Sequence, residues 1–539
     1  MENQLNLGMA FSGGGYRAAT FDLGTLSMLN SIRLENGRTL LSCVAALTSV
    51  SGGTIPAMKY MLALAKGEPV DEMINELFRF LCNEDLITHA LDGVKAEKAN
   101  RDASSIKIMA GIYDKYLFHG ATMGDIIDNM GNIPVKDYTA LATDFDNALP
   151  FRFRVTYGFM TNGERISYGV FGNKKHNIGL NVARHITPGE ALACSSCFPS
   201  GFEPMMYPDD FQVSQQAGIS SQIKSRFGIM DGGVTDNQGI SPLLMAEERL
   251  RTYRKDKSRT DKALDLAIIS DVSSSTMDGY APSEQLLPKS VGRLTLGRLR
   301  NYGLIGQVVV MALFLLSLLL GNNFWLGVMT VVLAILTLVN VVGALFKNKM
   351  FSAIEKTFIG NRARFINHLK FSTAEAMLMN RAKSVIMMSS EVFLKELRML
   401  NYNSIYSDKD WVNRVISSSI HELKPDKKWE RKDHDDSPQE VDLIPSEAIQ
   451  RNSALAASMG TTLWFTARDK AAGMPQALLA TGQYNICHNL LEYILRIEKS
   501  PNNLTDAHRL LIACKPQLEK AWKKFQADPQ WMVPTIEQE

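Results

Sequence analysis

Two glycine-rich turns, each between an apolar run and a helical pattern, constrain this chain more than any other feature. Residues 12–17, Ser-Gly-Gly-Gly-Tyr-Arg, follow an apolar run over residues 5–11, and residues 49–53, Ser-Val-Ser-Gly-Gly, end a second run over 43–50. Short apolar runs bounded by glycine predict buried strands. Repeated strand–turn–helix units predict an open α/β sheet, in which ligands bind at the carboxyl ends of the strands.

The two turns suit different chemistry. Consecutive glycines let the backbone approach a ligand closely and adopt positive φ without strain. The N–H groups there and at the start of the next helix are unpaired, so they can hold a phosphate or the oxyanion of an acyl-transfer intermediate. Ser51 fits a nucleophile elbow, the sharp turn that exposes a serine above the sheet, although Ser49 replaces the usual first glycine of that motif.

A third turn follows the apolar run over residues 227–230. It reads Asp231-Gly232-Gly233, and an Asp-Gly-Gly string after a strand is by itself typical of a plain structural turn. A glycine triplet alone is equally typical of a nucleotide-binding turn. The order, context and separation of the three turns are what indicate a shared site.

Taken together, the three turns resemble the patatin-like phospholipase family and are similar to its cytosolic phospholipase A branch. Residues 193–202, a small-residue segment with a proline turn, and residues 142–144, Ala-Thr-Asp, resemble further parts of that family. The resemblance covers residues 5–275, with fainter similarity over 447–495. It implies a Ser-Asp dyad without histidine, in which Ser51 is the nucleophile and Asp231 its base.

The same resemblance implies the rest of the site. Arg17 is expected to contact the substrate phosphate, because a planar and permanently charged guanidinium suits a phosphodiester better than a lysine does. Ala18 departs from the last glycine of the family's Gly-x-Gly-x-x-Gly pattern. The expected oxyanion hole consists of Gly13, Gly14 and Gly15. The expected supporting turns contain Gly53, Gly232 and Gly233.

The alternation of strands and helices predicts the fold of residues 1–275. We expect a patatin-like three-layer α/β sandwich with a central, largely parallel sheet. The expected strands are residues 5–11, 43–50, 138–143, 151–157, 227–230 and 264–271. The expected helices are residues 16–33, 53–66, 70–82, 188–196 and 237–253.

Residues 303–346 differ from everything before them. Residues 303–320 contain only Gln307 and Ser317 as clearly polar side chains, and residues 324–346 carry no charge. Because a spanning helix needs about 20 apolar residues, the two runs predict a transmembrane helical hairpin. Basic flanks would place the catalytic domain and both termini in the cytoplasm. The alternatives are a buried core hairpin or one that dips into a single leaflet.

The length of 539 residues suggests two or three units. After the catalytic domain (1–275) we expect a basic juxtamembrane segment (276–302), the hairpin (303–346), a helical region (347–435) and C-terminal helices that pack back on the catalytic domain (436–539).

The composition argues against several classes of function. A net charge of only +2 argues against a general nucleic-acid binder. Cys194 and Cys197 form a lone CxxC without a second pair or a histidine cluster, which argues against zinc. Nothing resembles a calcium-binding loop. We therefore expect no metal and no cofactor, and the largely apolar surroundings of the six cysteines fit a reducing compartment.

The expected function is that of a membrane-anchored serine hydrolase that cleaves acyl esters of glycerophospholipids. The alternatives are an acyltransferase or a neutral-lipid hydrolase with the same dyad, or a membrane scaffold without activity. A Ser-His-Asp triad is the mechanistic rival, with His185 as its best candidate. The expected partners are phospholipid and the bilayer, with a second copy of the chain or a regulatory protein left open.

Overall fold

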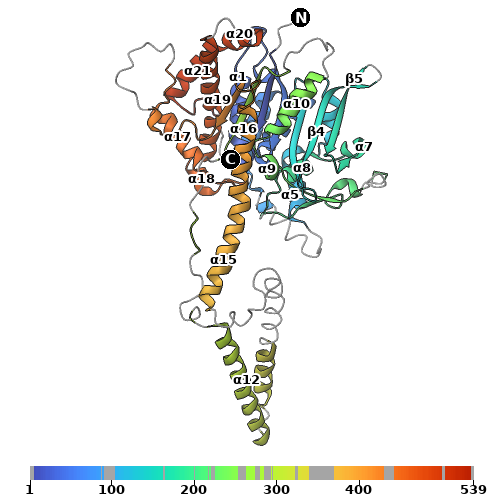
Figure 1. The fold of residues 1–539 in the computed structure, drawn as a ribbon, viewed down its shortest axis with the longest axis vertical. Coiled ribbons are helices and arrows are strands. Elements are labelled where there is room, and N and C mark those ends of the chain that lie inside the picture. Colours follow the sequence, from blue (N-terminus) through green and yellow to red (C-terminus); the bar gives the residue numbers. More distant parts are fainter. Residues whose placement is uncertain are drawn as a thin grey trace. The chain divides into compact units, whose positions relative to one another are not determined.

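The structure is a computed structural model, and it forms two compact units, residues 1–277 with 390–539 and residues 278–389 (Figure 1). It describes residues 5–86, 88–89, 104–161, 164–199, 201–215, 218–219, 225–252, 263–273, 280–283, 293, 295–321, 324, 326–338, 370–429, 442–499 and 504–535.

The first unit is built on one mixed sheet. Its main path runs β10-β9-β1-β2-β3-β4-β5-β6, and β8 pairs with β3 and β7. The five strands from β10 to β3 are parallel, whereas β4, β5, β6 and β8 run antiparallel to their neighbours. The strands are β1 Leu7–Phe11, β2 Val44–Val50, β3 Asp137–Asp144, β4 Leu149–Thr161, β5 Glu164–Gly172, β6 Asn177–Ile178, β7 Met205–Tyr207, β8 Phe227–Asp231, β9 Leu266–Asp271 and β10 Val415–Ser419.

All six strands expected from the sequence are present, each within a few residues of the expected ends. The antiparallel strands beyond β3 were not expected. The short turn over residues 145–148 explains β4, because only antiparallel neighbours can be joined by so few residues. β10 lies within the region expected to be helical, since its Val-Ile-Ser-Ser-Ser run is too short and polar to stand out.

One detail of the register brings two of the turns together. Val50 at the end of β2 pairs with Leu141 of β3, and Asp231 at the end of β8 pairs with the next residue, Ala142. β4 pairs with β3 along the whole of one edge, so β2 and β8 share the other edge of β3, and β8 begins to pair where β2 stops. β2 and β8 therefore meet end to end beside β3, and the residue after Val50 is Ser51.

Helices cover both faces of this sheet. On one face, α10 and α16 pack through Leu243 and Ile405 onto the small residues of β1 and β2. On the other face, α1 and α19 lie alongside each other (Figure 1). A Cβ at Gly24 of α1 or at Gly482 of α19 would overlap the backbone of the other helix, which is why the pair can cross so closely.

The helices of this unit are α1 Gly15–Ser31, α2 Thr54–Lys66, α3 Val70–Asn83, α5 Ser105–Tyr113, α6 Met123–Asn129, α7 Leu180–Ala183, α8 Pro188–Ser196, α9 Gly233–Asp236, α10 Ile240–Thr252, α16 Phe393–Tyr406, α17 Glu447–Ala457, α18 Ala467–Ala471, α19 Met474–Glu498, α20 Asp506–Ala513 and α21 Lys515–Ala527.

The second unit contains α12 (Leu296–Leu319) and α15 (Phe371–Met387). Among the described residues, no helix combines the length and hydrophobicity that a bilayer crossing requires, so the predicted two-span membrane protein is wrong. The first turns of α12 carry Arg298, Arg300 and Asn301. The second expected run is described at residues 324 and 326–338. The expected hairpin end, 339–346, and residues 347–369 lie outside the described residues.

Candidate active site

Ser51 occupies a strained turn at the end of β2. Its φ is +49°, a left-handed conformation that residues other than glycine seldom adopt. A short 3₁₀ turn over Ser51–Gly53 then leads into α2, so the chain passes from strand to helix within three residues. This strand–turn–helix geometry is that of a nucleophile elbow, in which backbone strain presents the serine hydroxyl above the sheet. The side chain is nearly buried, with 9% of the residue exposed.

Asp231 lies at the end of β8 and is also buried. Its Oδ1 accepts a 2.6 Å hydrogen bond from the Gly233 N–H. Burial raises the pKa of Asp231 to about 7, and the Gly233 N–H and the nearby Ser51 side chain oppose this rise. A carboxylate with a pKa near neutrality is suited to take a proton from a serine and return it during one turnover.

The glycine turn lies next to Ser51. A Cβ added to Gly13 would come within 3.1 Å of the Ser51 Cβ. The Gly13 N–H donates a 2.9 Å hydrogen bond to the Asn237 carbonyl, so it is not free to receive an oxyanion. In the part of the chain that the structure describes, the N–H groups of Gly14 and Gly15 have no partner. These two donors, at the start of α1, are the ones available for a developing negative charge.

Each of the expected supporting glycines lies in close contact with its surroundings, Gly53 and Gly232 with backbone carbonyls and Gly233 with the side chains of Asn237 and Asp231. A Cβ at Gly53 would approach the Ser12 carbonyl to 2.7 Å, and one at Gly232 would overlap the Leu141 carbonyl. Gly15 also has a positive φ, +60°, and this conformation would be strained for a residue with a side chain. These contacts bring residues 12–15, 51–53 and 231–233 into one cluster.

The carboxyl end of α8 makes hydrogen bonds to two of the three turns, those at Ser51 and at Asp231. No role in the site was predicted for this helix from the sequence. The Ser195 hydroxyl accepts from the Ser51 N–H at 2.9 Å and donates to the Leu141 carbonyl at 2.7 Å. The Asp231 N–H donates to the Cys197 carbonyl at 3.0 Å, and the Gly232 N–H donates to the Ser195 carbonyl at 3.2 Å. The only sequence signal for this role was the run of small residues over 193–202.

Ser195→Ala is therefore expected to lower both stability and activity. It leaves the buried Ser51 N–H and Leu141 carbonyl without this partner, which costs about 1–3 kcal/mol in the free energy of unfolding. Urea unfolding and ester hydrolysis measure the two effects. Ser196→Ala is the matched control, because the Ser196 hydroxyl donates to Leu192 within its own helix. Equal activity losses in both variants would contradict a specific role for Ser195.

Arg17 points its guanidinium toward a C-terminal segment. Its Nη1 donates to the Met459 carbonyl at 2.7 Å and its Nη2 to the Thr461 hydroxyl at 3.3 Å. The preceding residue, Tyr16, donates its N–H to the Thr462 carbonyl at 2.7 Å. The buried Nε atom of Arg17 has no hydrogen-bond partner within the described ranges. Burial lowers the pKa of Arg17, and the charge of Asp271 opposes this shift.

The histidines do not take part in this cluster in the described residues. His185 is exposed in the turn before α8. His176 Nδ1 instead donates a hydrogen bond to the Asp144 carboxylate, 2.9 Å away. Within the described ranges, no histidine is a hydrogen-bond partner of Ser51 or Asp231.

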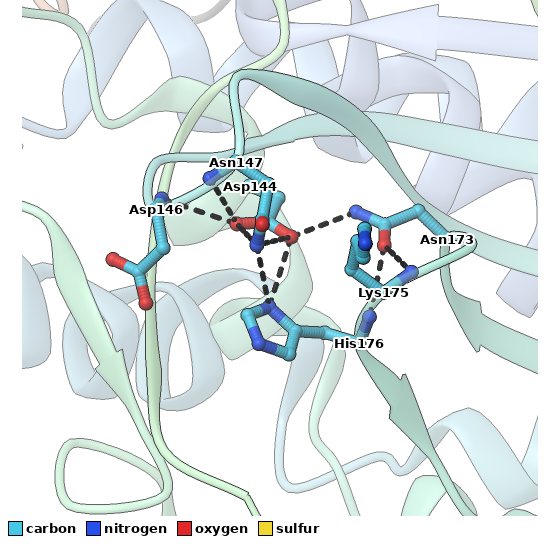
Figure 2. A network of polar contacts seen from close by, with 6 residues as sticks. All are labelled: Asp144, Asp146, Asn147, Asn173, Lys175 and His176. Carbon is cyan, nitrogen blue, oxygen red and sulfur yellow. Dashed lines mark hydrogen bonds and ion pairs between the residues drawn. The ribbon is translucent and has the colours of Figure 1, made fainter.

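Asp144 is the centre of a polar network that anchors β8 (Figure 2). Its buried carboxylate accepts from the Asn173 side chain at 2.9 Å and from the backbone and side chain of Asn147. Burial opposes ionisation, but these hydrogen bonds and His176 lower the pKa of Asp144. The His176 ring stacks on Phe227, the first residue of β8, with centroids 4.2 Å apart. The network thus fixes the start of the strand that ends at Asp231.

Comparison with known proteins finds solved structures of human GIVD cytosolic phospholipase A2. One is 15% identical, covers 50% of this chain and 43% of that chain, and has a TM-score of 0.32. Its complex with methyl gamma-linolenyl fluorophosphonate is 13% identical, covers 50% of this chain and 40% of that chain, and has a TM-score of 0.27. This chain thus matches less than half the length of those structures. No protein-family model and no curated protein matches it.

Proposed function

We propose that the protein is a serine lipid hydrolase that cleaves acyl esters of glycerophospholipids, with Ser51 as nucleophile and Asp231 as base. The observation that carries the proposal is the strained Ser51 turn beside the buried carboxylate of Asp231, which has a pKa of about 7. A serine hydroxyl is a weak nucleophile until an adjacent base removes its proton. Here the base adjoins it directly.

The proposed reaction has two steps. In the first, the Ser51 oxygen attacks the ester carbonyl while Asp231 takes the hydroxyl proton, and the Gly14 and Gly15 N–H groups stabilise the oxyanion. The tetrahedral intermediate expels the lysophospholipid alkoxide, which receives the proton from Asp231. In the second step, water attacks the acyl-enzyme with Asp231 as base, and the proton returns to Ser51 as the fatty acid leaves.

Product analysis tests this proposal. Purified protein incubated with phosphatidylcholine vesicles should release free fatty acid and lysophospholipid in equal amounts, and Ser51→Ala should release neither. Transfer of the acyl chain to an added alcohol in place of water would favour the acyltransferase alternative. Protein that releases no fatty acid from any acyl ester would contradict the proposal and favour the inactive scaffold.

Arg17 is expected to select substrates with a phosphate. Its guanidinium bonds to the Met459 carbonyl and the Thr461 hydroxyl, and a phosphate would compete with these acceptors for a planar fork that lysine lacks. Arg17→Lys should raise KM for phosphatidylcholine at least about tenfold, the cost of roughly one charged hydrogen bond, and change KM for a neutral acyl ester much less. Thr461→Val is the control, because it removes the Nη2 contact and keeps the guanidinium. Equal KM changes for both substrates would contradict a phosphate contact and favour a neutral-lipid hydrolase.

The rate should depend on pH through Asp231. Only the ionised carboxylate can accept the Ser51 proton, and burial sets its pKa at about 7. We therefore expect kcat/KM for an uncharged ester to rise tenfold per pH unit below about pH 7 and to level off above it. A profile that stays flat down to pH 5 would show that the base has an ordinary carboxyl pKa.

A further inference from the structure

A second group of chemically reactive side chains lies between α19 and the turn after β10. It comprises Glu422 from that turn, and His488 and Glu492 from α19. The possible ligand atoms of the three residues lie within 4.8 Å of one another. His488 and Glu492 are four residues apart on one helix and so share a face. None of the three belongs to the Ser51 site.

The orientation of the His488 ring is fixed by its neighbours. Trp429 and Trp522 pack against it, with ring centroids 6.0 and 5.2 Å away. Only 3% of the residue is exposed. A ring held in this way loses no further freedom when it binds a ligand, which favours affinity.

A neighbouring amide also fixes the tautomer. Asn489 donates its amide N–H to Glu422 Oε2 at 3.0 Å, so its carbonyl Oδ1 faces His488 Nδ1, 3.2 Å away. Nδ1 must then carry the proton, and the lone pair falls on Nε2. Nε2 is shielded from solvent, and among the described residues it has no hydrogen-bond partner. A histidine that binds a metal through one ring nitrogen usually donates a hydrogen bond from the other.

The two carboxylates complete a donor set for a divalent metal. Among the described ion pairs, neither Glu422 nor Glu492 is neutralised by a cation. Glu492 is exposed, so its side chain can rotate toward the group without a change in the core. Glu422, Asn489 and Glu492 line a cavity of about 870 Å³, which leaves room for a water molecule or another ligand at an open coordination position.

We propose that Glu422, His488 and Glu492 form a binding site for a divalent transition metal, of which Zn²⁺ is the best fit. One neutral imidazole and two carboxylates match the nitrogen and oxygen donors that Zn²⁺ accepts at about 2.0–2.2 Å, with a fourth position open to the cavity. The imidazole disfavours Mg²⁺ and Ca²⁺, which prefer oxygen alone. The metal would join α19 to the turn that follows the edge strand β10.

The test measures binding, independently of hydrolysis. The full-length protein is stripped with a chelator, dialysed against Zn²⁺ buffered at a micromolar free concentration, and analysed for bound metal and for the temperature of unfolding. We expect one Zn²⁺ per chain and a higher Tm. Glu492→Gln should weaken binding at least tenfold, and because Glu492 is exposed this variant should fold normally.

Glu498→Gln is the matched control, since Glu498 lies on the same helix and lines the same cavity but pairs with Lys515 at 2.8 Å. It should bind Zn²⁺ as the unchanged protein does. The proposal is overturned if the unchanged protein binds no Zn²⁺, if Glu492→Gln binds it equally well, or if Mg²⁺ at the same concentration raises Tm as much as Zn²⁺.

Discussion

Ser51→Ala is expected to reduce ester hydrolysis by at least about 10⁴-fold, because loss of the nucleophile of a serine hydrolase costs this much or more. The fold should be unchanged. The bond from the Ser51 N–H to Ser195 is made by the backbone, and alanine meets the same strain as serine at a φ of +49°. Initial rates on phosphatidylcholine and urea unfolding of the same preparation measure the two quantities.

The neighbouring serine provides the control for this variant. Ser49 lies two residues earlier on β2, where its hydroxyl contacts Thr54 and Tyr138 and not Asp231. Ser49→Ala should therefore keep most of the activity. Activity retained by Ser51→Ala, or lost equally by both variants, would exclude Ser51 as the nucleophile.

Asp231→Asn is expected to have the second largest effect, a loss of about 10²–10⁴-fold, which is the usual contribution of a general base. Asparagine has the same shape, and its Oδ1 can still accept from the Gly233 N–H at 2.6 Å. It cannot take up the Ser51 proton. Rates measured from pH 5 to 9 should also lose the rising limb near pH 7, and a limb that survives in the variant would have another origin.

The same variant should change stability in a pH-dependent way. Asp231 has a pKa of about 7 when folded and about 4 when unfolded. The folded protein therefore holds a proton that the unfolded chain has lost between these two pH values, so its stability falls as pH rises through this window. Relative to the unchanged protein, Asp231→Asn should be more stable at pH 8 and about equally stable near pH 4, below the window, as thermal unfolding would show.

The positions of the three turns could be predicted because each is local. An apolar run followed by glycine determines where a strand ends, and Ser51 and Asp231 follow such runs directly. How Asp231 reaches Ser51 could not be predicted. The parallel-sheet rule expects both at carboxyl ends of parallel strands, whereas β8 is antiparallel to β3 and meets β2 end to end. That pairing depends on contacts between residues nearly 90 positions apart.

The hydrogen-bond partners of the site residues could not be predicted from the sequence either. Ser195 supports the Ser51 turn, and the Gly13 N–H is taken by the Asn237 carbonyl, so the expected three donors become Gly14 and Gly15. Arg17 contacts a segment more than 440 residues away. The hairpin prediction failed for the opposite reason. It relied on the apolar runs and their basic flanks, whereas α12 begins at Leu296 and so includes Arg298 and Arg300 in the helix itself.

Labelling with an alkyl fluorophosphonate tests the convergence of the three turns most directly. The reagent needs an activated serine beside an oxyanion hole, and peptide mass mapping identifies the residue that it modifies. We predict a single adduct on Ser51, no adduct in Ser51→Ala, and labelling at least a hundredfold slower in Asp231→Asn. No adduct on Ser51, or one formed equally fast without Asp231, would contradict the dyad.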